Sequence, residues 1–287
     1  MKSSYCLLLI LCCFASCETP VERESAKLKD LDILKIEPQP GDWLEDHKES
    51  YLTVNDYIRR KPLRTDSIGK YLYVVKLGIF DSVSNQIFSI TKEYLATFFL
   101  IEVKELSALD ANIIPKENTR ANGQIDAAYI LDNVLYKIVP DDAHSIIALT
   151  TIDMYPGNDW NFVFGLASLQ KRVGVWSMSR FTEKNCDTIN FEKTLFRTLK
   201  TASHETGHMF GLPHCAVYEC NMNGSNSLTE SDRQVGWLCH ECVAKLCWNR
   251  NVPAKKHIES MKSFYTKYMT NSREAAYYKS AAEITNE

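Results

Sequence analysis

Residues 204–214, His-Glu-Thr-Gly-His-Met-Phe-Gly-Leu-Pro-His, form the pattern HExxHxxGxxH, from which both fold and function can be inferred. His204 and His208 are four residues apart, so on a helix they lie one turn apart on the same face, and both imidazoles can reach one metal ion. Gly211 has no Cβ, so the chain can adopt a positive φ there. Such a turn would end the helix and return His214 to the same ion.

The three histidines indicate a catalytic rather than a structural zinc site. Three neutral imidazoles leave the fourth tetrahedral position of a zinc ion open, as catalytic zinc sites require. Glu205 directly follows the first ligand, so its carboxylate would lie beside the ion, where it can take a proton from a metal-bound water. HExxH alone occurs by chance in ordinary helices. A helix that merely buries histidines would need neither Gly211 nor Glu205.

The residues after the third histidine carry a family resemblance. Cys215 follows it at once, Cys220 and Met222 come next, and Cys239 and Cys242 form a CxxC pair. HExxHxxGxxHC-x4-C-x-M followed by CxxC resembles the archaemetzincins, a branch of the metzincin metallopeptidases. The resemblance covers about residues 70–250, and its specific motifs lie within residues 204–242.

This resemblance implies a zinc-dependent peptidase with two Zn²⁺ ions per chain. The three histidines would bind the catalytic zinc, Glu205 would be its general base, and Met222 would form the Met-turn beneath it. The implied fold is α/β and metzincin-like: a twisted mixed sheet with one antiparallel edge strand, backing helices, an active-site helix and a small C-terminal subdomain stapled by zinc. The partner would be a peptide or protein substrate.

Two interpretations of the cysteines compete. By resemblance Cys215, Cys220, Cys239 and Cys242 bind the second, structural zinc, and their short spacings are typical of metal knuckles. In an exported protein the same four residues could instead form two disulfides. Cys186 and Cys247 could pair with each other or be unrelated small buried residues.

Residues 1–17 have the features of a secretory signal peptide. A lysine at position 2 precedes a short apolar run, and Ala15-Ser16-Cys17 closes it with small residues. The ending resembles a bacterial lipoprotein signal with Cys17 as the lipidated first residue of the mature chain, which would attach an exported protein to a membrane. A plain signal peptide, giving a secreted protein, or an uncleaved anchor are the alternatives.

Composition excludes one class of partner. The chain has 287 residues and a formal net charge of −3. Without a large basic field it has nothing to attract nucleic acid.

We expect a monomer, with a tether and N-terminal extension over residues 18–65 and a metallopeptidase domain over residues 66–287, divided at about residue 211 into upper and lower subdomains. The extension contains PGDWL (residues 40–44), which resembles the longer archaemetzincins; the segment up to Lys29 is expected to be the tether.

Periodicity predicts an alternation of strands and helices. Strands are expected at 71–79, 98–103 and 145–152, with amphipathic helices at 82–97 and 124–139 between them, which favours a mainly parallel sheet. Residues 161–168 and 172–181 are two strands joined too closely for a crossover, so one should be antiparallel. The active-site helix is expected over 190–211, a helix start at Ser227, a helix over 238–246 and a last helix over 254–278.

Strand 161–168 would form the upper rim of the cleft by resemblance. Its free backbone groups could pair with an extended peptide; alternatively, a loop of the protein covers this edge.

Two other functions remain open at this point. One is a non-catalytic, zinc-stabilised peptide-binding surface protein, for which an intact Glu205 would have no use. The other is a zinc hydrolase of non-peptide amides.

Overall fold

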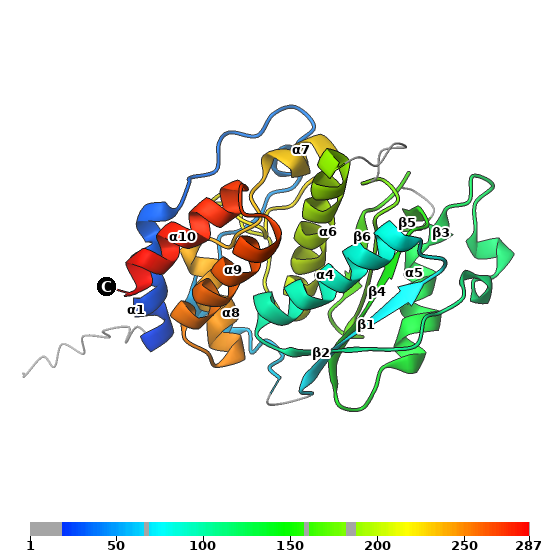
Figure 1. Cartoon of the computed structure of the whole chain (residues 1–287), viewed down its shortest axis with the longest axis horizontal. Helices are drawn as coiled ribbons and strands as arrows, with labels where there is room; N and C mark the ends of the chain where they lie inside the picture. The colour runs from blue at the N-terminus through cyan, green and yellow to red at the C-terminus, as the bar shows by residue number, and fades with distance from the viewer. Residues whose placement is uncertain (1–18, 66–68, 158–160, 182–187, 287) are drawn as a thin grey trace, which may run out of the picture.

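The computed structural model describes residues 19–65, 69–157, 161–181 and 188–286. Its main sheet has the strand order β2-β1-β4-β7-β6, and Figure 1 shows it beside a group of helices formed by the two ends of the chain. All neighbouring strands are parallel except β6, which is antiparallel to β7. The predicted mixed sheet with one antiparallel edge strand is therefore confirmed. The strands are β1 (Tyr71–Leu77), β2 (Glu102–Glu105), β4 (Ala143–Thr150), β6 (Gly165–Ser168) and β7 (Val173–Ser177), with β3 (Ile125–Asp126) and β5 (Met154–Tyr155) forming a separate parallel pair.

Helices cover both faces of the sheet because side chains of successive strand residues point to opposite faces. In β1, Leu72 and Val74 pack with α4 (Ser82–Phe99) and α6 (Thr188–Met209). The alternate residues Tyr73 and Val75 pack on the other face, against α5 (Ala127–Tyr129) and the π-helix Ile130–Leu135 that continues it. This arrangement holds α6, which carries the first two histidines, firmly against the sheet.

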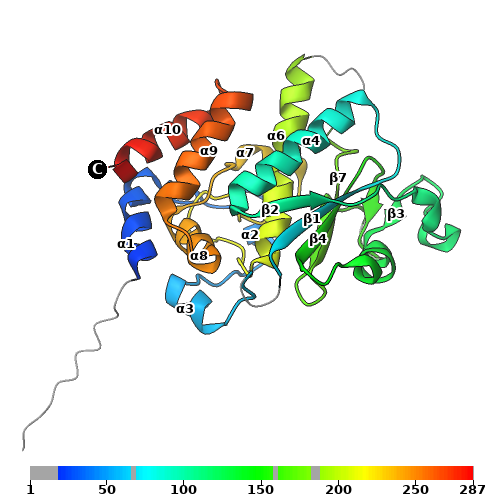
Figure 2. The ribbon, with the colours of Figure 1, turned by 60° about the horizontal axis from the view of Figure 1, so that its bottom comes forward.

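Helix α6 is anchored by a stripe of buried apolar residues. Leu195, Leu199 and Ala202 are almost fully buried, and they lead directly to the histidines one turn later. Figure 2 shows α6 and α4 between the sheet and the C-terminal helices. Within the described residues, no helix combines the length and hydropathy that crossing a membrane requires.

The C-terminal region differs from the prediction of one helix over 254–278. It forms two helices, α9 (Ala254–Tyr268) and α10 (Arg273–Asn286), which lie against each other (Figures 1 and 2). Ser272 accepts a hydrogen bond from the Ala275 amide, so it starts a new helix, and Tyr265 and Tyr278 stack at 5.4 Å across the pair. The second helix extends past the predicted end at residue 278 and is buried there, since Ala281 and Ala282 are no more than 1% exposed.

The N-terminal extension also departs from expectation. From Pro20 the chain forms α1 (Pro20–Ala26) and a 3-10 helix (Lys27–Leu31) rather than a tether, and α1 packs against α8 (His240–Arg250). Leu28 is fully buried, which explains why this segment is ordered despite its charged composition. The extension continues through α2 (Trp43–Asp46) and α3 (Val54–Arg59). Helix α7 (Leu228–Arg233) follows the active-site helix α6 in the chain.

Two predicted element boundaries were wrong. Residues 98 and 99, expected in a strand, end α4 instead, because their two phenylalanine rings fill the core from the helix. Leu100 then has a φ of 47°, which ends the helix before β2 begins at Glu102. The helix expected over 124–139 starts later, after the short strand β3, and is split between α5, a π-helix and the 3-10 helix Tyr136–Ile138. Further 3-10 helices are Ala111–Ile113 and Lys116–Asn118.

Candidate active site

The three histidines of the motif converge. Their ligand nitrogens lie within 4.8 Å of one another, and the Nε2 atoms of His204 and His208 are 3.1 Å apart. Helix α6 supplies the first two, and Gly211 supplies the turn: its φ is +78°, as predicted from its lack of a Cβ. The turn brings His214 back beside them, with ring centroids 5.3 and 4.9 Å from those of His204 and His208.

Each histidine is held through its other ring nitrogen. The Nδ1–H group of His204 donates to the Asn221 carbonyl and that of His208 donates to the Leu212 carbonyl, both at 2.8 Å. A carbonyl oxygen can only accept, so these Nδ1 atoms carry the proton. Burial lowers the pKa of His208 to about 4 and also lowers the pKa of His204, so both rings are neutral near pH 7, with a lone pair on Nε2.

This donor set fits a zinc ion. Two lone pairs 3.1 Å apart repel each other unless a cation lies between them. Zinc–nitrogen bonds of 2.0–2.1 Å in a tetrahedron would place neighbouring nitrogens about 3.3 Å apart. His214 completes the set, with its Nδ1 atom 2.8 Å from the Glu49 carboxylate. The sequence did not reveal these three acceptors, which fix the tautomer of the ligands.

Glu205 lies beside the histidines and faces the edge strand. Burial raises the pKa of its carboxyl group to about 7. Gly165 of β6 allows the close approach, since a Cβ there would lie 2.9 Å from Glu205 Cγ. Both residues line a cleft of about 580 Å³, whose other walls include residues 161–164, Trp43 and the buried Lys200. The rim predicted at 161–168 is thus in place, although only residues 165–168 form a strand.

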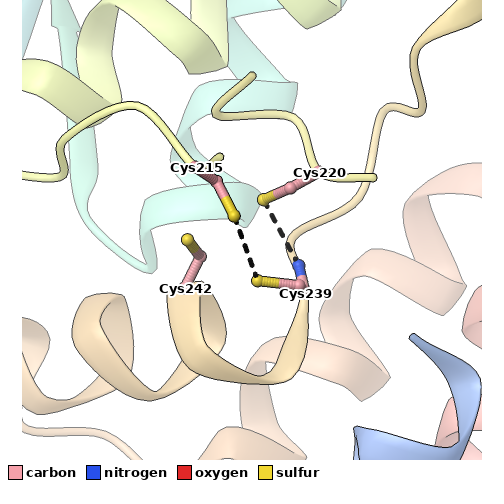
Figure 3. Close-up of side chains that lie close together, drawn as sticks. All are labelled: Cys215, Cys220, Cys239 and Cys242. Atoms are coloured by element: carbon pink, nitrogen blue, oxygen red, sulfur yellow. Dashed lines mark hydrogen bonds between the residues drawn. The ribbon is translucent and has the colours of Figure 1, made fainter. Parts of the chain in front are cut away.

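The four cysteines of the motif also come together. Figure 3 shows their side chains facing one another, two from the loop after the third histidine and two from the start of α8. They are free thiols, and their sulfur atoms lie within 4.8 Å of one another. Cys215 Sγ is 3.8 Å from Cys239 Sγ, and a tetrahedron with zinc–sulfur bonds of about 2.3 Å has an edge of about 3.8 Å.

The surroundings of the cysteines favour thiolates bound to a cation. Backbone N–H groups of Met222 and Cys239 donate to Cys220 Sγ at 3.5 and 3.4 Å. Burial raises the pKa of Cys220, and neighbouring sulfurs raise that of Cys239, so these thiolates need a positive ion to remain charged. The donor set therefore fits zinc, as the histidine set does.

Met222 packs against α6 between the first two histidines and also contacts the cysteine loop. It is fully buried and packs against α6 at Gly207, where a Cβ would lie 2.7 Å from its sulfur. Its carbonyl accepts the Cys215 amide at 2.8 Å, and the preceding residue, Asn221, supplies the acceptor for His204. This position fits the Met-turn that the resemblance implies.

Other sequence predictions have varied outcomes. Ser227 caps α7, as the helix start predicted at this residue implies, and the buried Glu230 accepts the amides of Trp43 and Asn226. His240 is partly buried and paired with Asp32. Cys247 is a buried free thiol. Cys17 and Cys186, for which the sequence also made predictions, lie outside the described residues.

Comparison with known proteins identifies the family. A model of Peptidase family M54 matches residues 116–247. Archaemetzincin-2 from Macaca fascicularis is 33% identical over 243 residues, covering 72% of this chain and 67% of that protein. The solved archaemetzincin from Methanopyrus kandleri superposes with a TM-score of 0.53 and 29% identity, covering 63% of this chain and 95% of that one. A zinc-dependent peptidase from Methanocorpusculum labreanum gives a TM-score of 0.50 and 25% identity, covering 61% and 99%. The metal-binding geometry and these relatives together show that the chain belongs to the archaemetzincins, a family of zinc metallopeptidases.

Proposed function

We propose that this chain hydrolyses peptide bonds in the cleft, with Glu205 as general base, and that Cys215, Cys220, Cys239 and Cys242 hold a second, structural zinc. The observation that carries the proposal is the convergence of one ring nitrogen from each of the three histidines beside a partly buried carboxylate. Bound zinc would supply Lewis-acid chemistry, polarising a carbonyl and acidifying water. Glu205 would hold the proton of the attacking water on its carboxylate and deliver it to the leaving amine.

Strand β6 supports an extended peptide as the substrate. It is the edge of the main sheet, its residues line the cleft, and no other strand of the described residues pairs with its outer side. A peptide could add to this edge through main-chain hydrogen bonds, as in β-augmentation. Glu205 lies against the same strand at Gly165, so a peptide bound there would pass directly over the base.

The test is cleavage of a peptide library by the purified protein, followed by mass spectrometry. We expect cleavage that stops when zinc is removed with a chelator and returns when zinc is restored. Peptides with N-methylated amides beside the scissile bond should be cleaved more slowly, because they lose the donors that pair with a strand edge. Cleavage that survives complete removal of the metal would contradict the proposal.

For the N-terminus we propose that residues 1–17 are a lipoprotein signal and that Cys17 carries a lipid anchor. The support is the sequence pattern: a basic start, a short apolar run and small residues before Cys17. We expect metabolic labelling with an alkyne fatty acid to label the protein, and we expect the labelled protein in the membrane fraction. Cys17→Ser should abolish the label, whereas Cys247→Ser should retain it. Equal labelling of both variants would contradict the anchor.

A further inference from the structure

We propose that Glu49 of the N-terminal extension is a positioning residue for the third histidine, so that segment 43–49 forms part of the metal site. The inference rests on the proposed function, because it treats His214 as a zinc ligand. It goes beyond the motif, since Glu49 lies 165 residues before His214.

One carboxylate oxygen of Glu49 accepts two hydrogen bonds. Glu49 Oε1 lies 2.8 Å from His214 Nδ1 and 2.9 Å from Trp43 Nε1, whose indole N–H can only donate. The carboxylate accepts from both, which places the proton of His214 on Nδ1 and leaves its Nε2 lone pair for the metal. The ring of Trp43 also lies edge-on to His214, with centroids 5.0 Å apart, and stacks on His47 at 3.7 Å.

The third histidine needs this support more than the other two. His204 and His208 sit on a long helix, and backbone carbonyls of Asn221 and Leu212 hold their rings. His214 follows the turn at Gly211, outside the helix, and its Nδ1 partner is a side chain from a distant segment. An ionised acceptor makes a stronger hydrogen bond than a neutral one and raises the basicity of the imidazole. Glu49 should therefore control both the orientation and the donor strength of this ligand.

Segment 43–49 is docked by contacts that do not involve Glu49. The Trp43 amide donates to the buried Glu230 at 3.0 Å, and Asp42, just before the segment, pairs with Arg233 at 2.6 Å. The indole packs so closely on Gly224 that a Cβ there would lie 2.5 Å from Trp43 Cδ1. Changing Glu49 should thus leave the segment in place and remove only the contact to His214. This separation makes the role of Glu49 testable.

The experiment measures zinc affinity rather than turnover. The full chain, with Glu49→Ala or Glu49→Gln, is titrated with a competing zinc chelator, and the release of each equivalent is followed. In Glu49→Ala we expect the histidine-bound zinc to bind about 10- to 100-fold more weakly, with the cysteine-bound zinc unchanged. Glu49→Gln keeps an acceptor without the charge, so its affinity should lie between those of Glu49→Ala and the parent.

The matched control is Glu45→Gln, on the same segment. Glu45 is exposed, and its carboxylate contacts the Gly41 amide rather than a histidine, so zinc affinity should match the parent. Cobalt(II) in place of zinc gives a second readout, since its visible spectrum should change in Glu49→Ala and not in Glu45→Gln. Parent-like zinc affinity in Glu49→Ala would overturn the proposal.

A folding defect would not leave the question open. If Glu49→Ala fails to fold, Glu49→Gln provides the test, because it keeps the size of the side chain and removes only the charge of the group that accepts from His214. It should still weaken the histidine-bound zinc by a few-fold, and parent-like affinity would again overturn the proposal. Failure of the proposed function would give a different result. Zinc affinity would still depend on Glu49, but the parent protein would cleave no peptide.

Discussion

Glu205→Gln is expected to lower peptide hydrolysis by about 10²- to 10⁴-fold, the usual contribution of a general acid–base residue. Glutamine has nearly the same size as glutamate, so the contact with Gly165 and the shape of the cleft should persist. What disappears is the carboxylate that holds the proton of the attacking water. The measurement is kcat/KM on the best library peptide, together with zinc content by mass spectrometry.

Zinc content separates this effect from damage to the site. The Nδ1 atoms of His204 and His208 are held by backbone carbonyls rather than by Glu205, so Glu205→Gln should keep the zinc content of the parent. Glu192→Gln is the control, because Glu192 is an exposed residue on the same helix. Equal activity in Glu205→Gln and the parent would rule out Glu205 as the base. It would leave the metal site and the family assignment intact.

The second large effect is expected from Cys239→Ser. This variant should bind one zinc ion per chain instead of two, and it should be unfolded at 37 °C, without a cooperative thermal transition. Binding of a structural zinc contributes about 10–16 kcal/mol in small zinc domains, and a typical domain is stable by only about 5–15 kcal/mol. Cys239 is also the N-cap of α8, but serine is a preferred N-cap residue. The loss can therefore be attributed to the missing thiolate.

The control for this variant is Cys247→Ala. Cys247 is as buried as Cys239 and lies on the same helix, but it is not part of the four-cysteine group. Its replacement should cost little and keep both zinc ions. Thermal unfolding and metal analysis check both variants. The intact mass of the parent tests the alternative interpretation of the cysteines. One zinc ion, together with a mass about four hydrogens below that of the fully reduced chain, would show two disulfides in place of the second zinc.

The local signals in the sequence predicted most of the site because the relevant groups are close in sequence. His204 and His208 share a helix face, and Gly211 has the positive φ that its lack of a Cβ permits. The cysteine spacing places two of the four cysteines on one loop and two at the start of α8. The alternation of strands with helices likewise predicted the parallel part of the sheet, and the short link between 161–168 and 172–181 predicted its antiparallel edge.

Local pattern failed where contacts between distant segments decide the structure. An unbroken amphipathic pattern over 254–278 conceals the turn before Arg273, which is favoured because α10 can fold back and stack Tyr278 on Tyr265. The charged N-terminal segment looks like a tether, yet Leu28 fits into the core and α1 packs on α8.

The sequence by itself determined the metal-binding groups, the family and the layout of the sheet, since periodicity and short spacing act within a few turns of chain. Only the tertiary structure decided what supports those groups. Glu49 is one acidic residue among many in a polar stretch, and nothing near it in the sequence marks it as different. It reaches His214 because Trp43 docks on Gly224 and Glu230, and such packing depends on the shape of the folded core rather than on the order of residues along the chain.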